Sequence, residues 1–102
     1  MMSFLKRIFG GQVIDLKALR EEGAVILDVR TPSEFKSGHI KGSVNVPLQV
    51  LGQHLEKLDK NKTIITCCAS GMRSGSAKSI LQSKGFVAHN GGGWQSLQRK
   101  LI

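Results

Sequence analysis

A buried strand that leads through a tight turn into a helix is encoded between Thr63 and Ser74. β-branched residues fill Thr63–Thr66, which favours a central strand, and small residues after Cys68 allow the turn. This arrangement directs unpaired backbone N–H groups and the positive end of a helix at one sulfur. Such a site favours an anion and lowers the pKa of a thiol. We therefore expect a nucleophilic cysteine here, with the other residues as its scaffold.

The chain on either side alternates short strands with helices. Strands are predicted at 12–14, 24–30, 43–46, 63–66 and 86–88. Helices are predicted at 16–22, between Thr31 and Gly38, from Leu48 to about Asp59, at 74–84 and at 94–101. The glycine run Gly91–Gly93 is expected to form a flexible or left-handed loop. The alternation predicts a three-layer α/β fold, a five-stranded parallel sheet with helices on both faces. Ligands bind such sheets outside the carboxyl ends of the strands, where Cys68 is placed.

Length and composition narrow the functional classes. At 102 residues the chain is expected to form one domain over 12–102, after a mobile tail at 1–11 whose alternative role is a membrane-surface or partner anchor. The formal charge of +8 suits anions, but an aromatic content of 5% argues against a stacking platform for nucleic acid. No run reaches the roughly 18 apolar residues of a transmembrane segment. Without a secretory signal, and with two adjacent cysteines instead of a spread disulfide framework, a cytoplasmic protein is expected.

Four motifs follow one another along the chain: Leu27–Phe35 (LDVRTPSEF), Gly38–Pro47 (GHIKGSVNVP), Cys68–Ser74 (CASGMRS) and Gly91–Trp94 (GGGW). Together, in this order, they resemble a single-domain rhodanese, and the resemblance extends from about Val13 to the C-terminus. It implies a rhodanese-like sulfurtransferase whose active-site cysteine alternates between thiolate and persulfide. It also implies a five-stranded parallel sheet, in agreement with the pattern of strands and helices.

The resemblance also implies roles for single residues. The active-site loop is Cys68–Arg73, with Cys68 as the nucleophile. The substrate-binding residues are Ala69, Ser70, Gly71, Met72, Arg73 and Ser74. The thiolate attacks the outer sulfur of thiosulfate, sulfite leaves, and the persulfide passes its sulfur to a nucleophile such as a thiol or a thioredoxin-like protein. No cofactor is implied, and no His/Cys spacing suggests a zinc site.

Three charged residues are expected to support the site. Arg30 and Glu34 are predicted to form an ion pair, and Asp28 is predicted to accept hydrogen bonds from loop amides, because buried charges usually persist as pairs. Cys67 is expected to be buried and to point away from Cys68, since neighbours on a strand alternate faces. A resolving thiol is the alternative role for Cys67.

Two other functions stay open. Counted from Cys67, the chain has a cysteine, five residues and Arg73, the spacing of cysteine-dependent phosphatases, whose loop is one residue longer than that of a rhodanese. The second alternative is a non-catalytic module that docks a partner through its basic surface. A monomer is expected, and thiosulfate, a persulfidated protein, a small thiol and a thioredoxin-like protein each fit as sulfur donor or acceptor.

Overall fold

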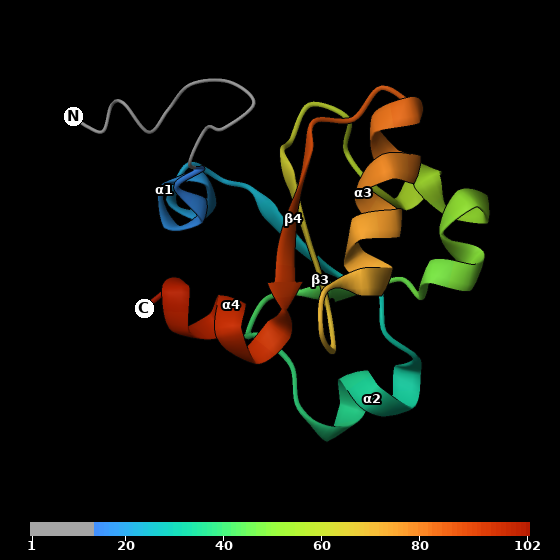
Figure 1. The fold of residues 1–102 in the computed structure, drawn as a ribbon. Coiled ribbons are helices and arrows are strands. Elements are labelled where there is room, and N and C mark those ends of the chain that lie inside the picture. The colour runs from blue at the N-terminus through green and yellow to red at the C-terminus, as the bar shows by residue number, and fades with distance from the viewer. Residues whose placement is uncertain (1–13) are drawn as a thin grey trace.

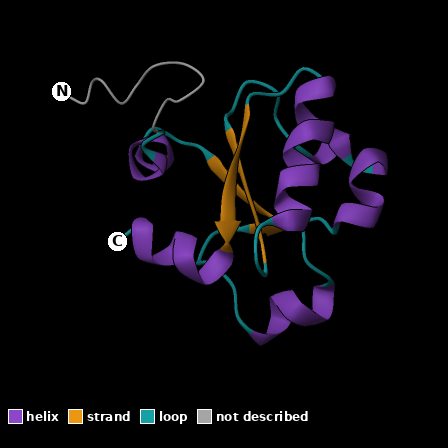
Figure 2. Ribbon diagram, in the orientation of Figure 1, coloured by secondary structure: helices purple, strands orange, loops and turns teal. Residues whose placement is uncertain are grey.

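The computed structural model describes residues 14–102, which form a four-stranded parallel sheet with helices on both faces (Figures 1 and 2). The spatial order of the strands is β2–β1–β3–β4. The strands are β1 (Val25–Asp28), β2 (Val44–Asn45), β3 (Ile64–Cys68) and β4 (Ala88–Gly93). The α-helices are α1 (Leu16–Glu21), α2 (Pro32–Ser37), α3 (Met72–Ser83) and α4 (Trp94–Lys100), and two short 3-10 helices are η2 (Leu48–Gln53) and η3 (Leu55–Lys57).

Each face of the sheet has its own apolar core, because successive side chains of a strand point to opposite faces. Cys68 belongs to the core beneath α3, η2 and η3, together with Leu81 of α3. Cys67 belongs to the core beneath α1 and α4, together with Leu97 of α4. Figure 1 shows these two groups of helices on opposite sides of the strands. The two neighbouring thiols therefore point into different cores, as the sequence predicts.

The predicted α/β fold with a parallel sheet between helices is confirmed, with one strand fewer in the described part of the chain. Of the strand predicted at 12–14, only Ile14 lies within the described residues, and it is outside the sheet. The tail predicted at 1–11 lies outside the described residues. Within residues 14–102, no helix combines the length and apolar character needed to cross a membrane.

The helix predicted from Leu48 is wrong in type, although its apolar face is correct. The segment forms the two 3-10 helices η2 and η3. Leu51 is fully buried, and Leu48, Leu55 and Leu58 pack against the same core. A 3-10 helix has three residues per turn, so leucines spaced by three fall on one side of it. The same spacing is compatible with an α-helix, which is why the sequence favoured the longer element.

The glycine run before α4 lies within β4 and not in the predicted loop, although Gly92 has a left-handed φ of +83°, as one form of the prediction expected. A Cβ atom at Gly91 would lie 2.7 Å from the carbonyl oxygen of Thr66, and one at Gly93 would lie 2.9 Å from that of Ala69. Glycine therefore allows β4 to approach β3 and the following turn this closely. The register shifts between Thr66 and Cys68, so that Gly93 pairs with Cys68 at the carboxyl edge of the sheet.

Candidate active site

A short turn joins Cys68, the last residue of β3, to Met72, the first residue of α3. The turn ends at Gly71, whose φ of +112° lies in the left-handed region that favours glycine. This conformation brings the N–H of Gly71 to 3.0 Å from Cys68 Sγ. The N–H of Ser74, in the first turn of α3, lies 3.3 Å from the same sulfur. Unpaired donors at the start of the helix thus point at the thiol.

Two opposing effects set the pKa of the Cys68 thiol. Burial raises it, because an apolar surrounding disfavours the thiolate. A hydrogen bond with the Ser74 hydroxyl, and hydrogen bonds from the N–H groups of Ser74, Gly71 and Ser70, lower it. The hydrogen bonds outweigh burial, so the pKa of Cys68 lies below the ordinary value of a thiol.

This shift predicts the pH dependence of alkylation. Iodoacetamide reacts with the thiolate, so its rate rises with pH and reaches half its maximum at the pKa of the thiol. Since the pKa of Cys68 is lowered, the midpoint is expected below that of a free cysteine, about 8.5. Mass spectrometry of the Cys68 peptide gives the rate at each pH. The protein unfolded in urea is the control, and equal midpoints for the folded and unfolded chains would contradict the prediction.

The Ser74 hydroxyl lies beside the sulfur and accepts a hydrogen bond from the Cys68 thiol. Ser74 is buried, and its Oγ lies 3.4 Å from Cys68 Sγ. The same oxygen lies 2.7 Å from Oδ1 of Asn90, a residue of β4. Asn90 was not among the residues predicted for the site. Its one signal in the sequence is its position immediately before the glycine run.

Glu34 of α2 holds the guanidinium of Arg73. Arg73 Nη1 and Nη2 donate to the two carboxylate oxygens of Glu34 at 2.8 Å and 3.0 Å. These bonds, helped by the N–H of Thr31, lower the pKa of Glu34 to about 2, and the same pairing raises the pKa of Arg73. The predicted ion pair between Arg30 and Glu34 is therefore wrong. Arg30 reaches only the backbone carbonyl of Glu34, at 3.3 Å.

Arg30 pairs instead with Asp28, and both side chains are buried, 4% and 0% exposed. The Asp28 carboxylate accepts from Arg30 Nη2 at 2.7 Å and from the backbone N–H of Arg30 at 3.1 Å, and so it is not bound to the loop amides as predicted. Arg30 also donates to the carbonyl oxygen of Gly38 at 2.7 Å and lies 4.8 Å from the centre of the Trp94 ring. This pair ties the end of β1 to the segments that follow α2 and begin α4.

Cys67 has none of the features that mark Cys68. It is fully buried in the opposite core, and burial, with the negative charge of Asp28, raises the pKa of its thiol to about 12. A phosphatase loop from Cys67 to Arg73 would require the Cys67 thiol to face the turn. The geometry therefore gives no support to that alternative.

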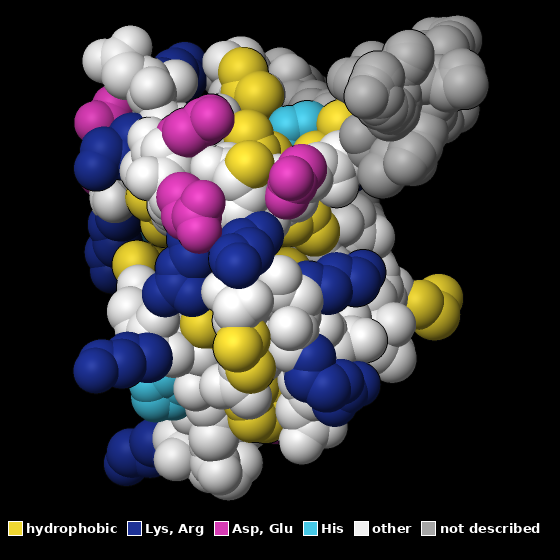
Figure 3. Space-filling model, turned by 90° about the vertical axis from the view of Figure 1, so that its left-hand side faces the viewer, with side chains coloured by type: hydrophobic (Ala, Val, Ile, Leu, Met, Phe, Trp, Pro, Cys, Tyr) yellow, Lys and Arg dark blue, Asp and Glu magenta, His cyan; other side chains and the backbone are white. Residues whose placement is uncertain are grey.

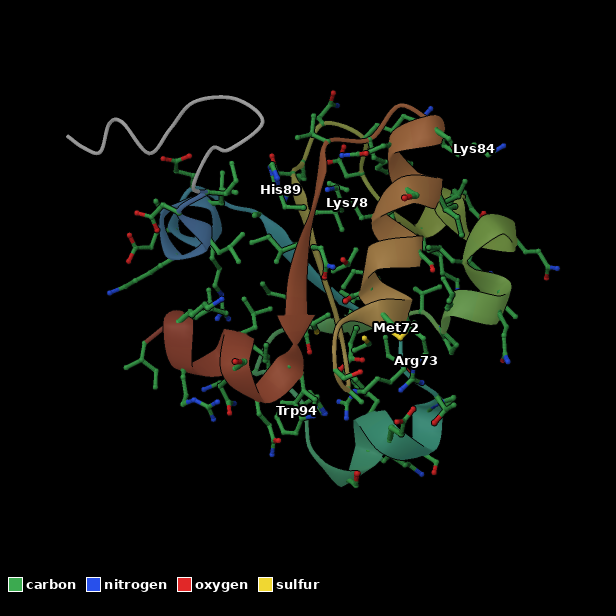
Figure 4. The ribbon with its side chains drawn as sticks, in the orientation of Figure 1. Met72, Arg73, Lys78, Lys84, His89 and Trp94 are labelled. Carbon is green, nitrogen blue, oxygen red and sulfur yellow. The ribbon has the colours of Figure 1, made fainter. Side chains whose placement is uncertain are left out.

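The turn that binds the sulfur also covers it. Cys68 is 1% exposed, whereas Met72 at the rim is 82% exposed. Figure 4 shows Met72 and Arg73 at the end of α3 that faces α2, and His89 and Lys78 nearer the other end of the sheet. Among residues 14–102, no three His, Cys, Asp or Glu side chains are grouped as metal ligands would be.

Charged side chains are mixed over the face shown in Figure 3. Lys and Arg are scattered across it, and Asp and Glu gather toward its upper end. Basic and acidic side chains thus share this face of the described residues, and its charge alone selects no class of partner.

A protein-family model covers nearly all of the described chain. The model described as "Rhodanese-like domain" matches residues 12–100. The chain belongs to the rhodanese-like domain family. The resemblance found in the four sequence motifs is thereby confirmed.

Curated relatives of this rhodanese-like chain include proteins named for sulfur transfer. Thiosulfate sulfurtransferase GlpE of Pseudomonas syringae is 39% identical over 70 residues, which cover 69% of this chain and 66% of the relative. Thiosulfate sulfurtransferase PspE of Escherichia coli is 34% identical over 74 residues, which cover 70% of this chain and 71% of the relative. The alignments thus span about two thirds of the length of each relative.

Solved structures share the rhodanese-like fold. The reduced Bacillus anthracis CoADR-RHD aligns with a TM-score of 0.74 at 37% identity, covering 85% of this chain and 16% of that one. A rhodanese-related protein from Thermoplasma volcanium aligns with a TM-score of 0.71 at 32% identity, covering 79% of this chain and 82% of that one. A structure described as "rhodanese with anions from E. coli" aligns with a TM-score of 0.66 at 34% identity, covering 72% of this chain and 91% of that one.

Proposed function

We propose that this protein is a sulfurtransferase that carries sulfane sulfur on Cys68. One observation carries the proposal: the N–H groups of Gly71 and Ser74 and the Ser74 hydroxyl converge on the Cys68 sulfur and lower its pKa. Membership of the rhodanese-like family and the names of the curated relatives support it. The proposed donor is a small sulfur-containing anion such as thiosulfate, and the proposed acceptor is a thiol, free or on a thioredoxin-like protein.

The first half-reaction loads the cysteine. The Cys68 thiolate attacks the outer sulfur of thiosulfate and forms a new S–S bond. The S–S bond of thiosulfate breaks, and its electron pair leaves with sulfite. Negative charge moves from Sγ to the outer sulfur of the persulfide. Main-chain N–H groups that stabilise the thiolate are placed to stabilise this second anion as well.

The second half-reaction unloads it. A thiolate or cyanide attacks the outer sulfur, the persulfide S–S bond breaks, and its electron pair returns to Cys68 Sγ as a thiolate. Neither half-reaction needs a proton delivered to a poor leaving group. We infer that a lowered thiol pKa and a set of anion donors are sufficient here, without a general acid at the turn.

We further propose that residues 69–74 form the binding site for the incoming anion. Ala69, Ser70 and Met72 are exposed at the rim, and the N–H of Gly71 points inward. The planar guanidinium of Arg73 can bind an oxyanion through two parallel hydrogen bonds, and in the free protein the Glu34 carboxylate accepts both of them. An incoming oxyanion therefore competes with Glu34, a half-buried partner that water also reaches.

Intact mass after incubation with thiosulfate tests the proposed function. We expect the mass to increase by one sulfur atom, at Cys68 in peptide mapping, and to return to the starting value after cyanide or a dithiol. Prior alkylation of Cys68 is the control and is expected to prevent the increase. A chain that gains no sulfur, or gains it at Cys67, would refute the assignment.

A further inference from the structure

The Asn90 amide is oriented by three hydrogen bonds at the edge of the site. The N–H of Gly92 donates to Asn90 Oδ1 at 2.8 Å, which identifies this atom as the acceptor. The Ser74 hydroxyl lies 2.7 Å from the same oxygen. On its other side, Asn90 Nδ2 donates to the carbonyl oxygen of Gly71 at 3.3 Å. Asn90 thus contacts both the turn and the hydroxyl that faces Cys68.

The Ser74 hydroxyl has one proton and more than one acceptor within reach. With a neutral thiol, Cys68 S–H donates to Ser74 Oγ, and Ser74 O–H donates to Asn90 Oδ1. The carbonyl oxygen of Gly71, 3.1 Å from Ser74 Oγ, is a second and more distant acceptor for the same proton. A thiolate has no proton to donate, so the hydroxyl either turns its lone pairs toward a negative sulfur or leaves Asn90 and donates to the sulfur. Ionisation of Cys68 therefore competes with the hydrogen bond to Asn90.

We propose that Asn90 is a positioning residue that competes with Cys68 for the Ser74 hydroxyl proton and so restrains formation of the thiolate. The role of Asn90 in catalysis rests on the proposed sulfur transfer. The hydroxyl donates to Sγ when the sulfur is a thiolate, and it returns to Asn90 when Sγ is an uncharged sulfur within the persulfide. Asn90 is itself exposed, so it acts through Ser74 and does not have to touch the reacting sulfur.

Other charged and titratable groups surround this chain of hydrogen bonds. Those on the elements packed around Cys68 are Cys67 on β3, Asp28 and Arg30 at the end of β1, Glu34 and Lys36 on α2, His54 between η2 and η3, Glu56 and Lys57 on η3, Arg73 and Lys78 on α3, and His89 on β4. Within the described residues, none of them hydrogen-bonds the Asn90 side chain. A substitution at Asn90 therefore changes the partner of Ser74 and leaves these groups in place.

The test compares substitutions that act in opposite directions. Asn90→Asp strengthens the competing acceptor and adds a negative charge, so the ionisation constant of Cys68 is expected to fall by about tenfold. Asn90→Ala removes the nearer acceptor and leaves the more distant Gly71 carbonyl oxygen as the competitor of the thiolate. The ionisation constant is therefore expected to rise, by at most about fivefold, the worth of one hydrogen bond. The readout is the pH midpoint of iodoacetamide alkylation at Cys68. Asn61→Asp, the same change in an exposed turn before β3, is the matched control and is expected to leave the midpoint unchanged.

A purely structural role would give a different result. If Asn90 only held the turn in shape, both Asn90 variants would loosen the turn and raise the alkylation midpoint toward that of a free cysteine. A rise of the midpoint in both variants would therefore overturn the proposal. In a Ser74→Ala background, Asn90→Ala is expected to have no further effect, and a shift that persists there would also overturn it. No thiosulfate is used, so this result and the sulfur-loading test can fail independently.

Discussion

Replacement of Cys68 by serine is expected to abolish sulfur transfer from thiosulfate, with a loss of at least about a thousandfold in turnover. An alcohol is far less acidic than a thiol, so the donors around Sγ cannot keep it ionised near neutral pH. Its oxygen also cannot carry sulfane sulfur as a persulfide does. Thiocyanate formation from thiosulfate and cyanide gives the rate, and intact mass shows whether the protein is loaded.

Cys67→Ala is the matched control, because it removes the neighbouring thiol from the opposite core. A free buried cysteine behaves as a small apolar residue, so alanine preserves the character of the position. Most of the activity is expected to be retained. If Cys67→Ala were inactive and Cys68→Ser active, Cys67 would be the nucleophile. The phosphatase spacing from Cys67 to Arg73 would then have to be reconsidered.

Asp28→Ala is expected to destabilise the fold by about 3–5 kcal/mol, the loss typical when one partner of a buried ion pair is removed. Arg30 would keep its charge in a site that is 4% exposed and would lose the carboxylate that accepts from Nε and Nη2. The midpoint of urea unfolding, with its slope, measures the change in the free energy of unfolding.

Two comparisons separate this effect from a general loss of charge. The double variant Asp28→Leu/Arg30→Met removes both buried charges and is expected to recover much of the lost stability. Glu34→Gln breaks the half-buried pair with Arg73, which water still reaches, and a much smaller loss is expected there. Equal destabilisation by Asp28→Ala and Glu34→Gln would show that burial of the Asp28–Arg30 pair is not the cause.

Local spacing was sufficient to locate the Cys68 turn. The β-branched run before it and the small residues after it lie within one short segment. Gly71 has a positive φ, which suits the glycine of a tight turn, and this depends only on residues close in the sequence. The separation of the two thiols was predictable for the same reason, because alternation along a strand depends on neighbouring residues only.

The charge pairing depended on contacts that no local pattern contains. Arg30 and Glu34 are four residues apart, a spacing that brings side chains together on a helix, but α2 begins at Pro32, after Arg30. Glu34 instead meets Arg73, 39 positions along the chain, because α2 lies below the start of α3 and the two long side chains reach each other (Figure 4). Such a contact follows from the packing of two elements at the carboxyl edge of the sheet.

The glycine run and Asn90 show the same limit. Three successive glycines favour a loop in isolation. Here the close approach of β3 to β4 leaves no room for a Cβ atom at Gly91, and the run becomes a strand. The role of Asn90 depends on that strand, because the N–H of Gly92 fixes the orientation of its amide.

The opposed directions of the two cysteines also determine how this protein withstands oxidants. They are the only cysteines in the chain. If peroxide converts Cys68 to a sulfenic acid, Cys67 cannot condense with it, because a disulfide requires sulfur atoms about 2.05 Å apart and these point into different cores. Repair then depends on a reductant from outside the chain, and without one the sulfur advances to sulfinic and sulfonic acids that do not revert.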